Sequence, residues 1–130
     1  MINILDQTPI AFVGGGRFCK QLLELLLSDQ FSDRQPIILG VADPNDQAEG
    51  VQYAREKGIY TTDRVEALYG LKGLKVLIEI TDDPALAKSI EKSKPKRLKL
   101  IDQIESRTLW SLLQVEVEKY KMLQTLQGAK

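Results

Sequence analysis

The fold of this chain is decided by the segment IAFVGGGRFC, which occupies positions 10–19. Its first four residues form a continuous apolar run, as in a strand that is buried on both faces. Three glycines follow, and beyond them Phe18, Leu22, Leu25 and Leu26 recur at helical spacing. The segment therefore predicts a strand, a glycine turn and a helix in succession.

The glycine turn has the features of a phosphate-binding loop. The first turn of a helix has N–H groups without intrahelical partners, and the helix dipole favours negative charge there. In a G-x-G-x-x-small pattern, Gly14 makes the tight turn, Gly16 allows close approach of a phosphate, and Cys19 is the small residue. Arg17 at the helix start adds positive charge. The alternative is a turn that only joins a strand to a helix.

An acidic residue ends the second apolar run, residues 36–42. In a parallel sheet of this kind, an acid in that position accepts hydrogen bonds from the ribose of an adenosine and repels a 2′-phosphate. This acid is Asp43, and neither Pro44 nor Asn45 supplies a cation for such a phosphate. The pattern predicts a preference for NAD(H) over NADP(H), unless Asp43 only caps the Asp-Pro-Asn turn.

Strands and helices continue to alternate after Asp43. Strands alternating with helices indicate a parallel sheet with right-handed crossovers, and we expect the strand order 3-2-1-4-5. Asp63 is the expected cap of a short helix. The further strands are predicted at residues 59–61, 76–80 and 97–101, and the longer helices at residues 47–57 and 84–93.

Polar residues follow the fourth strand, in the stretch from Thr81 to Pro84. Ligands of open α/β sheets bind beyond the carboxyl ends of strands where the strand order reverses, here between the first and fourth strands. Thr81 and Asp82 are therefore expected to line the crevice. The same stretch also has the pattern of a helix cap. The full predicted ligand-binding set is Gly14, Gly15, Gly16, Arg17, Phe18, Asp43, Pro44, Thr81 and Asp82.

A long helix is predicted from Ser106, its expected cap, to about Gln127. The predicted domains are residues 1–104, which bind the nucleotide, and residues 105–130, which form this helix. We expect its first half to pack on its own domain, whereas its second half either packs or pairs with another copy in a homodimer. The apolar residues that define its seam are Trp110, Leu113, Val117 and Tyr120.

The composition excludes several classes of function. The chain has 130 residues with a formal net charge of zero, so nucleic acid and anionic membranes exert no general attraction. It has no histidine, which excludes Ser-His-Asp and Cys-His catalysis and zinc sites that need imidazole. No signal peptide or membrane span is evident, and the lone Cys19 fits a reducing compartment. We expect a cytoplasmic protein with no metal site and no catalytic residue of its own.

Three stretches resemble the N-terminal domain of NAD(P)-dependent oxidoreductases: Val13–Arg17, Gly40–Asn45 and Ile78–Thr81. The most similar types are the glucose-fructose oxidoreductase/inositol dehydrogenase and homoserine dehydrogenase groups. The likeness extends over about residues 8–102. It implies a Rossmann-like α/β fold, with a parallel sheet of about five strands, helices on both faces and, after them, the long C-terminal helix.

Those enzymes continue into a catalytic domain, whereas this chain is expected to stop soon after the fifth strand. It also lacks the histidine and lysine motif that follows that strand in the inositol dehydrogenase group. It resembles instead the stand-alone or fused Rossmann modules of bacterial signalling proteins, which implies an NAD(H)-binding sensory or regulatory module. The alternatives are a small NAD-dependent oxidoreductase or a subunit of one, and a ligand-free or coenzyme A-binding interaction domain.

Overall fold

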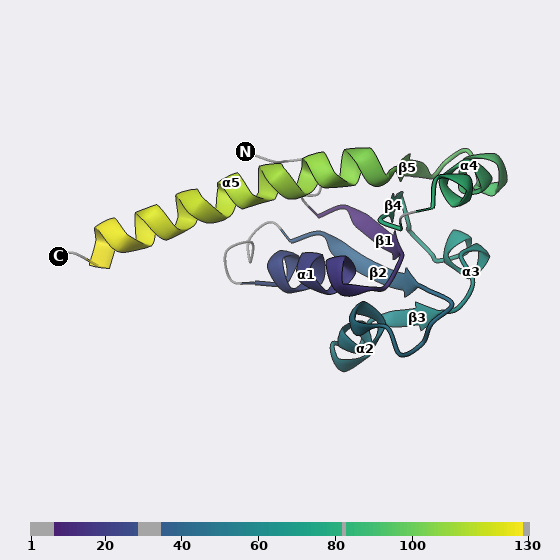
Figure 1. Cartoon of the computed structure of the whole chain (residues 1–130), viewed down its shortest axis with the longest axis horizontal. Coiled ribbons are helices and arrows are strands. Elements are labelled where there is room, and N and C mark those ends of the chain that lie inside the picture. Colours follow the sequence, from purple (N-terminus) through teal and green to yellow (C-terminus); the bar gives the residue numbers. More distant parts are fainter. Residues whose placement is uncertain (1–6, 29–34, 82, 129–130) are drawn as a thin grey trace.

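The computed structural model of the chain describes residues 7–28, 35–81 and 83–128. Within these residues, strands and helices alternate from β1 to β5, and a long helix follows (Figure 1). The elements are β1 (Pro9–Val13), α1 (Arg17–Leu26), β2 (Ile37–Ala42), α2 (Glu49–Glu56), β3 (Tyr60–Thr62), α3 (Glu66–Tyr69), β4 (Val76–Glu79), α4 (Pro84–Ser93), β5 (Lys99–Ile101) and α5 (Gln103–Gly128).

The strands form one parallel sheet in the order β3-β2-β1-β4-β5. This is the predicted order, with its reversal between β1 and β4. Val13 at the end of β1 pairs with Ala42 on one side and Glu79 on the other. The carboxyl ends of the three central strands therefore lie side by side, and the turns that leave them share one edge of the sheet.

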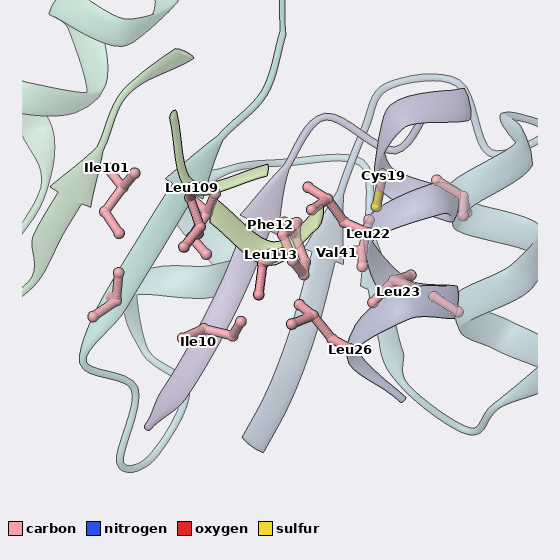
Figure 2. Packing of buried hydrophobic residues seen from close by; sticks show 14 of the residues in the cluster. Ile10, Phe12, Cys19, Leu22, Leu23, Leu26, Val41, Ile101, Leu109 and Leu113 are labelled. Carbon is pink, nitrogen blue, oxygen red and sulfur yellow. The ribbon is translucent and has the colours of Figure 1, made fainter. Parts of the chain in front are cut away.

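Helices cover both faces of the sheet, as predicted. On one face, α1, α2 and α5 pack on strand residues such as Ile10 and Phe12. Figure 2 shows Phe12 beside Leu113 of α5 and near Leu22 of α1. On the other face, α3 and α4 pack on the alternate strand residues, among them Ala11. The alternation of side chains along each strand thus divides the apolar residues between two cores.

The long helix begins earlier than the sequence predicted. Asp102 and Glu105 form a reciprocal capping box: the Glu105 N–H donates to Asp102 Oδ1 over 2.9 Å, and the Asp102 N–H donates to Glu105 Oε1 over 3.2 Å. The prediction that Ser106 caps this helix is wrong. Ser106 lies inside α5, is buried, and donates from its hydroxyl to the backbone carbonyls of Asp102 and Glu79. It therefore connects α5 to β4.

The predicted cap of the short helix is also wrong. Val65 occupies the N-cap position of α3, and no side chain caps that helix. The preceding turn is held by Thr62, whose hydroxyl oxygen accepts from the Arg64 N–H over 3.2 Å. The N-cap position of α3 lies two residues after Asp63. The side chain of Asp63 is therefore too far from the first N–H groups of the helix to cap them.

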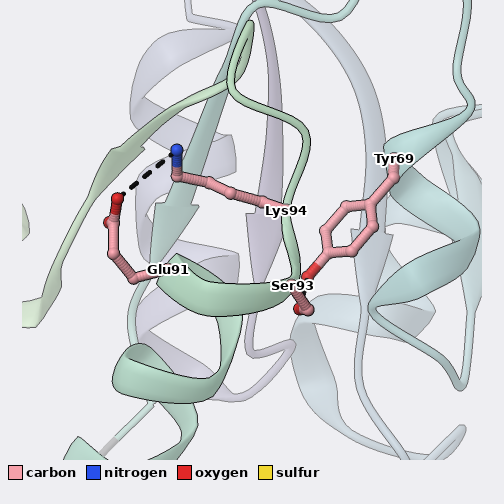
Figure 3. A network of polar contacts seen from close by, with 4 residues as sticks. All are labelled: Tyr69, Glu91, Ser93 and Lys94. Carbon is pink, nitrogen blue, oxygen red and sulfur yellow. Dashed lines mark hydrogen bonds and ion pairs between the residues drawn. The ribbon is translucent and has the colours of Figure 1, made fainter.

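Polar contacts tie α3 and α4 together on their face of the sheet (Figure 3). The Tyr69 hydroxyl at the end of α3 lies 2.8 Å from Ser93 Oγ at the end of α4. Arg97 donates to the Tyr69 carbonyl over 2.6 Å, and Lys94 pairs with Glu91 at 3.4 Å. Arg97, which lies between α4 and β5, therefore helps to hold the end of α3, whereas Lys94 pairs within the end of its own helix.

The two halves of α5 have different surroundings. Leu109, Leu113 and Val117 are buried on the sheet, so the expectation that the first half packs on its own domain is confirmed. Every residue from 121 to 127 is exposed, and this end extends beyond the sheet (Figure 1). In the part of the chain that the structure describes, no helix combines the length and the apolar character needed to cross a membrane.

Candidate functional site

The glycine turn between β1 and α1 needs a glycine at its first position. Gly14 has a φ of +108°, a conformation that other residues rarely adopt. Its N–H donates to the Ala42 carbonyl over 2.8 Å, which joins the end of β1 to β2. A Cβ at Gly14 would lie 3.0 Å from Cγ2 of Thr81, so this turn also lies close to the β4–α4 turn.

The middle of the turn is in contact with the start of α2. The Gly15 carbonyl accepts from the N–H groups of Gly50, over 2.7 Å, and of Val51, over 3.1 Å. A Cβ at Gly50 would lie 2.7 Å from that carbonyl oxygen and 2.8 Å from the Gly16 oxygen, so only glycine fits there. Sequence reasoning missed Gly50, although a glycine inside a helical pattern is a signal of close backbone approach.

The start of α1 is open. Gly16 is its N-cap residue, no side chain caps the helix, and its first turn contains no acidic residue. A Cβ at Gly16 would have no atom within 4 Å. Because the first N–H groups of a helix lack intrahelical partners, this open end has the donors and the dipole to bind an anion.

The predicted cation at this end is engaged with a neighbouring helix. The guanidinium of Arg17 lies 3.6 Å from Glu49 Oε1, and both side chains are more than half exposed. An exposed pair of this kind contributes little to stability. It keeps the positive charge of Arg17 beside the glycine turn, between the starts of α1 and α2.

Asp43 organises the turns around the end of β2. Its Oδ2 accepts from the Gly15 N–H over 2.8 Å, and its Oδ1 accepts from the Asn45 N–H over 2.8 Å. The second bond is an Asx turn, which spans the exposed Pro44. The capping role considered for Asp43 is therefore present. Each carboxylate oxygen retains a further lone pair, so the same group can still accept from a ligand hydroxyl.

A cavity of about 330 Å³ lies beyond the ends of β2 and β3, next to Asp43. Its volume falls in the range of small-molecule sites. Arg55 contributes a cation that sequence reasoning missed, because it lies on α2 and not directly after Asp43. The other charged groups in the lining are the carboxylates of Asp43, Asp46 and Asp63, so the lining is negative overall. The uncharged lining residues are Val51, Thr61 and Thr62.

The turn after β4 carries the remaining predicted residues. Thr81 donates from its N–H, over 2.6 Å, and from its hydroxyl to Oε2 of Glu79. Asp82 lies outside the described residues. Asp83 caps α4 by accepting from the N–H groups of Ala85 and Leu86, which confirms the capping interpretation of this stretch.

Glu79 is a buried acid that sequence reasoning did not identify. It is the last residue of β4, is 1% exposed, and has an oxygen, Oε1, with no hydrogen-bond partner in the described part of the chain. A buried oxygen without a donor is costly, so a donor from a water or a ligand would be favourable there. The available signal was an acid at the end of an otherwise apolar strand.

Phe18 connects the start of α1 to the long helix. Its ring meets that of Trp110 edge-on, with the ring centres 5.5 Å apart and an interplanar angle of 79°. The side chain of Phe18 is thus used for packing, while its backbone remains in the first turn of α1.

The single cysteine is chemically inert at neutral pH. Cys19 is fully buried, and its pKa is raised from 9.0 to about 12, chiefly by burial and then by the negative charge of Asp43. The thiol therefore stays protonated and is a poor nucleophile.

No group of three or more His, Cys, Asp or Glu side chains within residues 7–28, 35–81 and 83–128 has the geometry to hold a metal ion.

Solved structures share this arrangement of strands and helices. No family model matches the chain, and no curated protein matches it either. Its structure is similar to that of GenD2 from gentamicin A biosynthesis in complex with NAD, with a TM-score of 0.55 and 17% identity over 78% of this chain. The fold is Rossmann-like.

The second similar structure is a putative NADPH-dependent oxidoreductase from Desulfitobacterium hafniense DCB-2. It has a TM-score of 0.55 and 13% identity over 78% of this chain. The chain spans 28% of the length of GenD2 and 27% of this second protein. At these identities the likeness establishes the Rossmann-like fold that the residues had suggested, and no more.

Proposed function

We propose that this chain is a module that binds NAD(H) at the carboxyl edge of its sheet. The observation that carries the proposal is the open start of α1 at Gly16, beside the Asp43 carboxylate and the cavity that it lines. The two similar structures are described as an NAD complex and as NADPH-dependent. A Rossmann-like fold with an uncapped first helix supports a dinucleotide ligand.

Each part of the ligand has a matching group on this edge. The pyrophosphate takes the N–H groups at the start of α1, where Gly16 leaves room and Arg17 adds charge. The adenosine ribose donates to Asp43, and the adenine enters the adjoining cavity. The nicotinamide half extends toward Thr81, at the reversal of the strand order.

The charges around Asp43 favour NAD(H) over NADP(H). A 2′-phosphate on the ribose would meet Asp43 directly and the carboxylates of Asp46 and Asp63 in the same cavity. Arg55 offsets part of this charge, but its guanidinium already donates to the Asp46 carbonyl over 3.1 Å. Three carboxylates against one cation make the cavity a poor site for a phosphate.

The role we assign to this binding is sensory or regulatory. The sequence has no histidine, and the thiol of Cys19 is buried and protonated, so it offers few groups for catalysis. The contact between Phe18 and Trp110 links the ligand site to α5. A ligand shifts such a system when it binds one arrangement of α5 better than another. We further propose that the chain acts in the cytoplasm as a homodimer, with contacts made by α5.

Calorimetric titration of the chain with NAD+, NADH, NADPH and coenzyme A tests this function. We expect saturable binding of NAD(H), with NADPH weaker and coenzyme A not bound. Asp43→Ala should weaken NAD(H) binding by about 1–3 kcal/mol, because the ribose hydroxyls lose their acceptor. Asp83→Ala is the matched control, since it removes a carboxylate at the neighbouring strand end that caps α4.

Asp43 also accepts a hydrogen bond from the Gly15 N–H, which the Asp43→Ala variant loses. Circular dichroism of this variant checks that the loss has not unfolded the domain. Absence of binding by all four ligands at millimolar concentration would overturn the cofactor assignment. Turnover of NADH by the purified chain would overturn the purely regulatory role in favour of an oxidoreductase.

A further inference from the structure

The long helix carries a second apolar stripe that its own domain leaves uncovered. Six large apolar residues of α5 are between 50 and 77% exposed: Ile104, Leu112, Val115, Met122, Leu123 and Leu126. The a/d spacing of a coiled coil, 3, 4, 3 and 4, is followed by four of them and by one lysine: Leu112, Val115, Lys119, Met122 and Leu126. This stripe differs from the seam at Leu109, Leu113 and Val117, which is buried on the sheet.

The two stripes lie on nearly opposite sides of the helix. At 3.6 residues per turn, Val115 points away from the side that carries Leu113 and Val117. The domain packs on one side of α5 and therefore cannot cover the other. Residues 121–127 are exposed on every side and have no support from the domain at all. A short helix without tertiary support is marginal in water, so this end needs a partner to remain helical.

We propose that this stripe pairs in an antiparallel orientation with the same stripe of a second copy of the chain. The two α5 helices then form the centre of a dimer, and the nucleotide-binding domains lie on the outside. The inference rests on the homodimer included in the proposed function and is independent of dinucleotide binding. It adds the face of the helix, the register and the direction of pairing.

The charges of the stripe select the antiparallel direction. Lys119 occupies an a position in its centre, and in a parallel pair the two Lys119 side chains would face each other. In an antiparallel pair with position 112 opposite position 122, Lys119 faces Val115 of the second copy. It then lies close to Glu116 and Glu118 of that copy, which extends the ion pair of 3.6 Å between Lys119 and Glu116 within one helix.

The area of the stripe is sufficient for a specific but reversible dimer. The apolar residues that the pairing covers present on the order of 500 Å² per copy, and thus about 1,000 Å² for the pair, which is near the lower limit for a specific interface: Leu112, Val115, Met122, Leu126 and the neighbouring Leu123. The same pairing would also lay the unsupported residues 121–127 of each helix along the first half of the other helix.

The oligomeric state tests the stripe. Sedimentation of the full chain over a series of concentrations should show a monomer–dimer equilibrium, and Val115→Glu should shift it to monomer. Gln124→Glu introduces the same charge at an exposed position on the opposite side of α5, and it should leave the dimer intact. A wild-type chain that stays monomeric, or a Val115→Glu variant that stays dimeric, would overturn the proposal.

Disulfide cross-linking tests the direction. The native Cys19 is buried, so engineered cysteines report alone. When differently tagged L112C and M122C chains are mixed and oxidised, we expect a cross-link between the two kinds of chain and none within either kind. In the antiparallel pair, two L112C sites are about 15 Å apart along the axis, too far for a disulfide. Self-linking of each variant would indicate a parallel dimer and overturn the proposed direction.

Titration of Val115→Glu with NAD(H) separates this inference from the proposed function. Retained binding by a monomer would show that the dinucleotide site stands without the dimer. Conversely, a wild-type dimer that binds no dinucleotide would support the helix pairing and overturn only the proposal that the ligand is a dinucleotide.

Discussion

The starts of α1 and α4 lie at the same edge of the sheet but are completed in different ways. Each helix follows a central strand, β1 or β4, at the reversal of the strand order. The start of α4 is closed by its own residues, since Asp83 accepts from two N–H groups and Pro84 occupies the first turn. The start of α1 has only Gly16, with no side-chain acceptor and open space around it.

The other long helices resemble α4 in this respect. The first N–H groups of α2 donate to the Gly15 carbonyl, and α5 has the capping box of Asp102 and Glu105. A missing cap costs a helix about 1 kcal/mol. Because the chain caps its other long helices, the open start of α1 is the feature on which the proposed anion site rests.

The largest expected effect is on the free energy of unfolding, at the contact between α2 and the glycine turn that precedes α1. Gly50→Ala would put a methyl group 2.7–2.8 Å from the carbonyl oxygens of Gly15 and Gly16, which are backbone atoms that cannot move aside. We expect the free energy of unfolding in urea to fall by about 3 kcal/mol. Gly70→Ala is the control, because its Cβ has no atom within 4 Å. Equal midpoints for the two variants would contradict the close contact of α2 with the glycine turn.

The next effect concerns the ligand and leaves stability nearly unchanged. Gly16→Ala adds a methyl group that contacts no atom of the protein, so its main clash is with a phosphate at the start of α1. We expect NAD(H) affinity to fall about 100-fold, or about 2.7 kcal/mol, in a calorimetric titration. The free energy of unfolding should change by no more than about 1 kcal/mol. An unchanged affinity would show that the phosphate does not bind at the start of α1.

The smallest effect is expected at the capped helix. Asp83→Ala removes the acceptor for the Ala85 and Leu86 N–H groups, and it should lower the free energy of unfolding by about 1 kcal/mol. NAD(H) affinity should stay the same, because α4 needs no ligand to complete its start. If affinity fell as far as in Asp43→Ala, the contrast between the two helix starts would have no functional meaning.

Much of this edge of the sheet could be predicted from local patterns. The run before Gly14, the glycine triplet and the acid Asp43 lie in order along the chain, and strands alternating with helices have few possible topologies. Asp83 and Pro84 form a helix-start signal within two residues. The capping box of Asp102 and Glu105 is equally local, so the start of α5, predicted at Ser106, lies within reach of the sequence pattern.

Other features of the site depend on residues that are distant in sequence. Gly50 matters because α2 lies against the glycine turn, and Arg55 matters because its side chain reaches the Asp46 carbonyl and lines the cavity. Glu79 belongs to an apolar strand pattern, and only its place beside Val13 reveals its position at the edge of the sheet. Local patterns mark Gly50 and Glu79 as unusual residues, but the partners that they contact are set by how distant elements pack.

The sequence by itself determined the order of the elements, the glycine turn and the position of Asp43, because each follows from short-range backbone preferences and hydrophobic periodicity. The sequence also predicted the seam of α5 that is buried, but only the tertiary structure decided that a second apolar stripe stays uncovered. The apolar residues of α5 allow two stripes, and the sheet selects Leu113 and Val117 since these face Phe12 and the rest of the core. Val115 and Met122 are left outside because one sheet can cover one side of a helix.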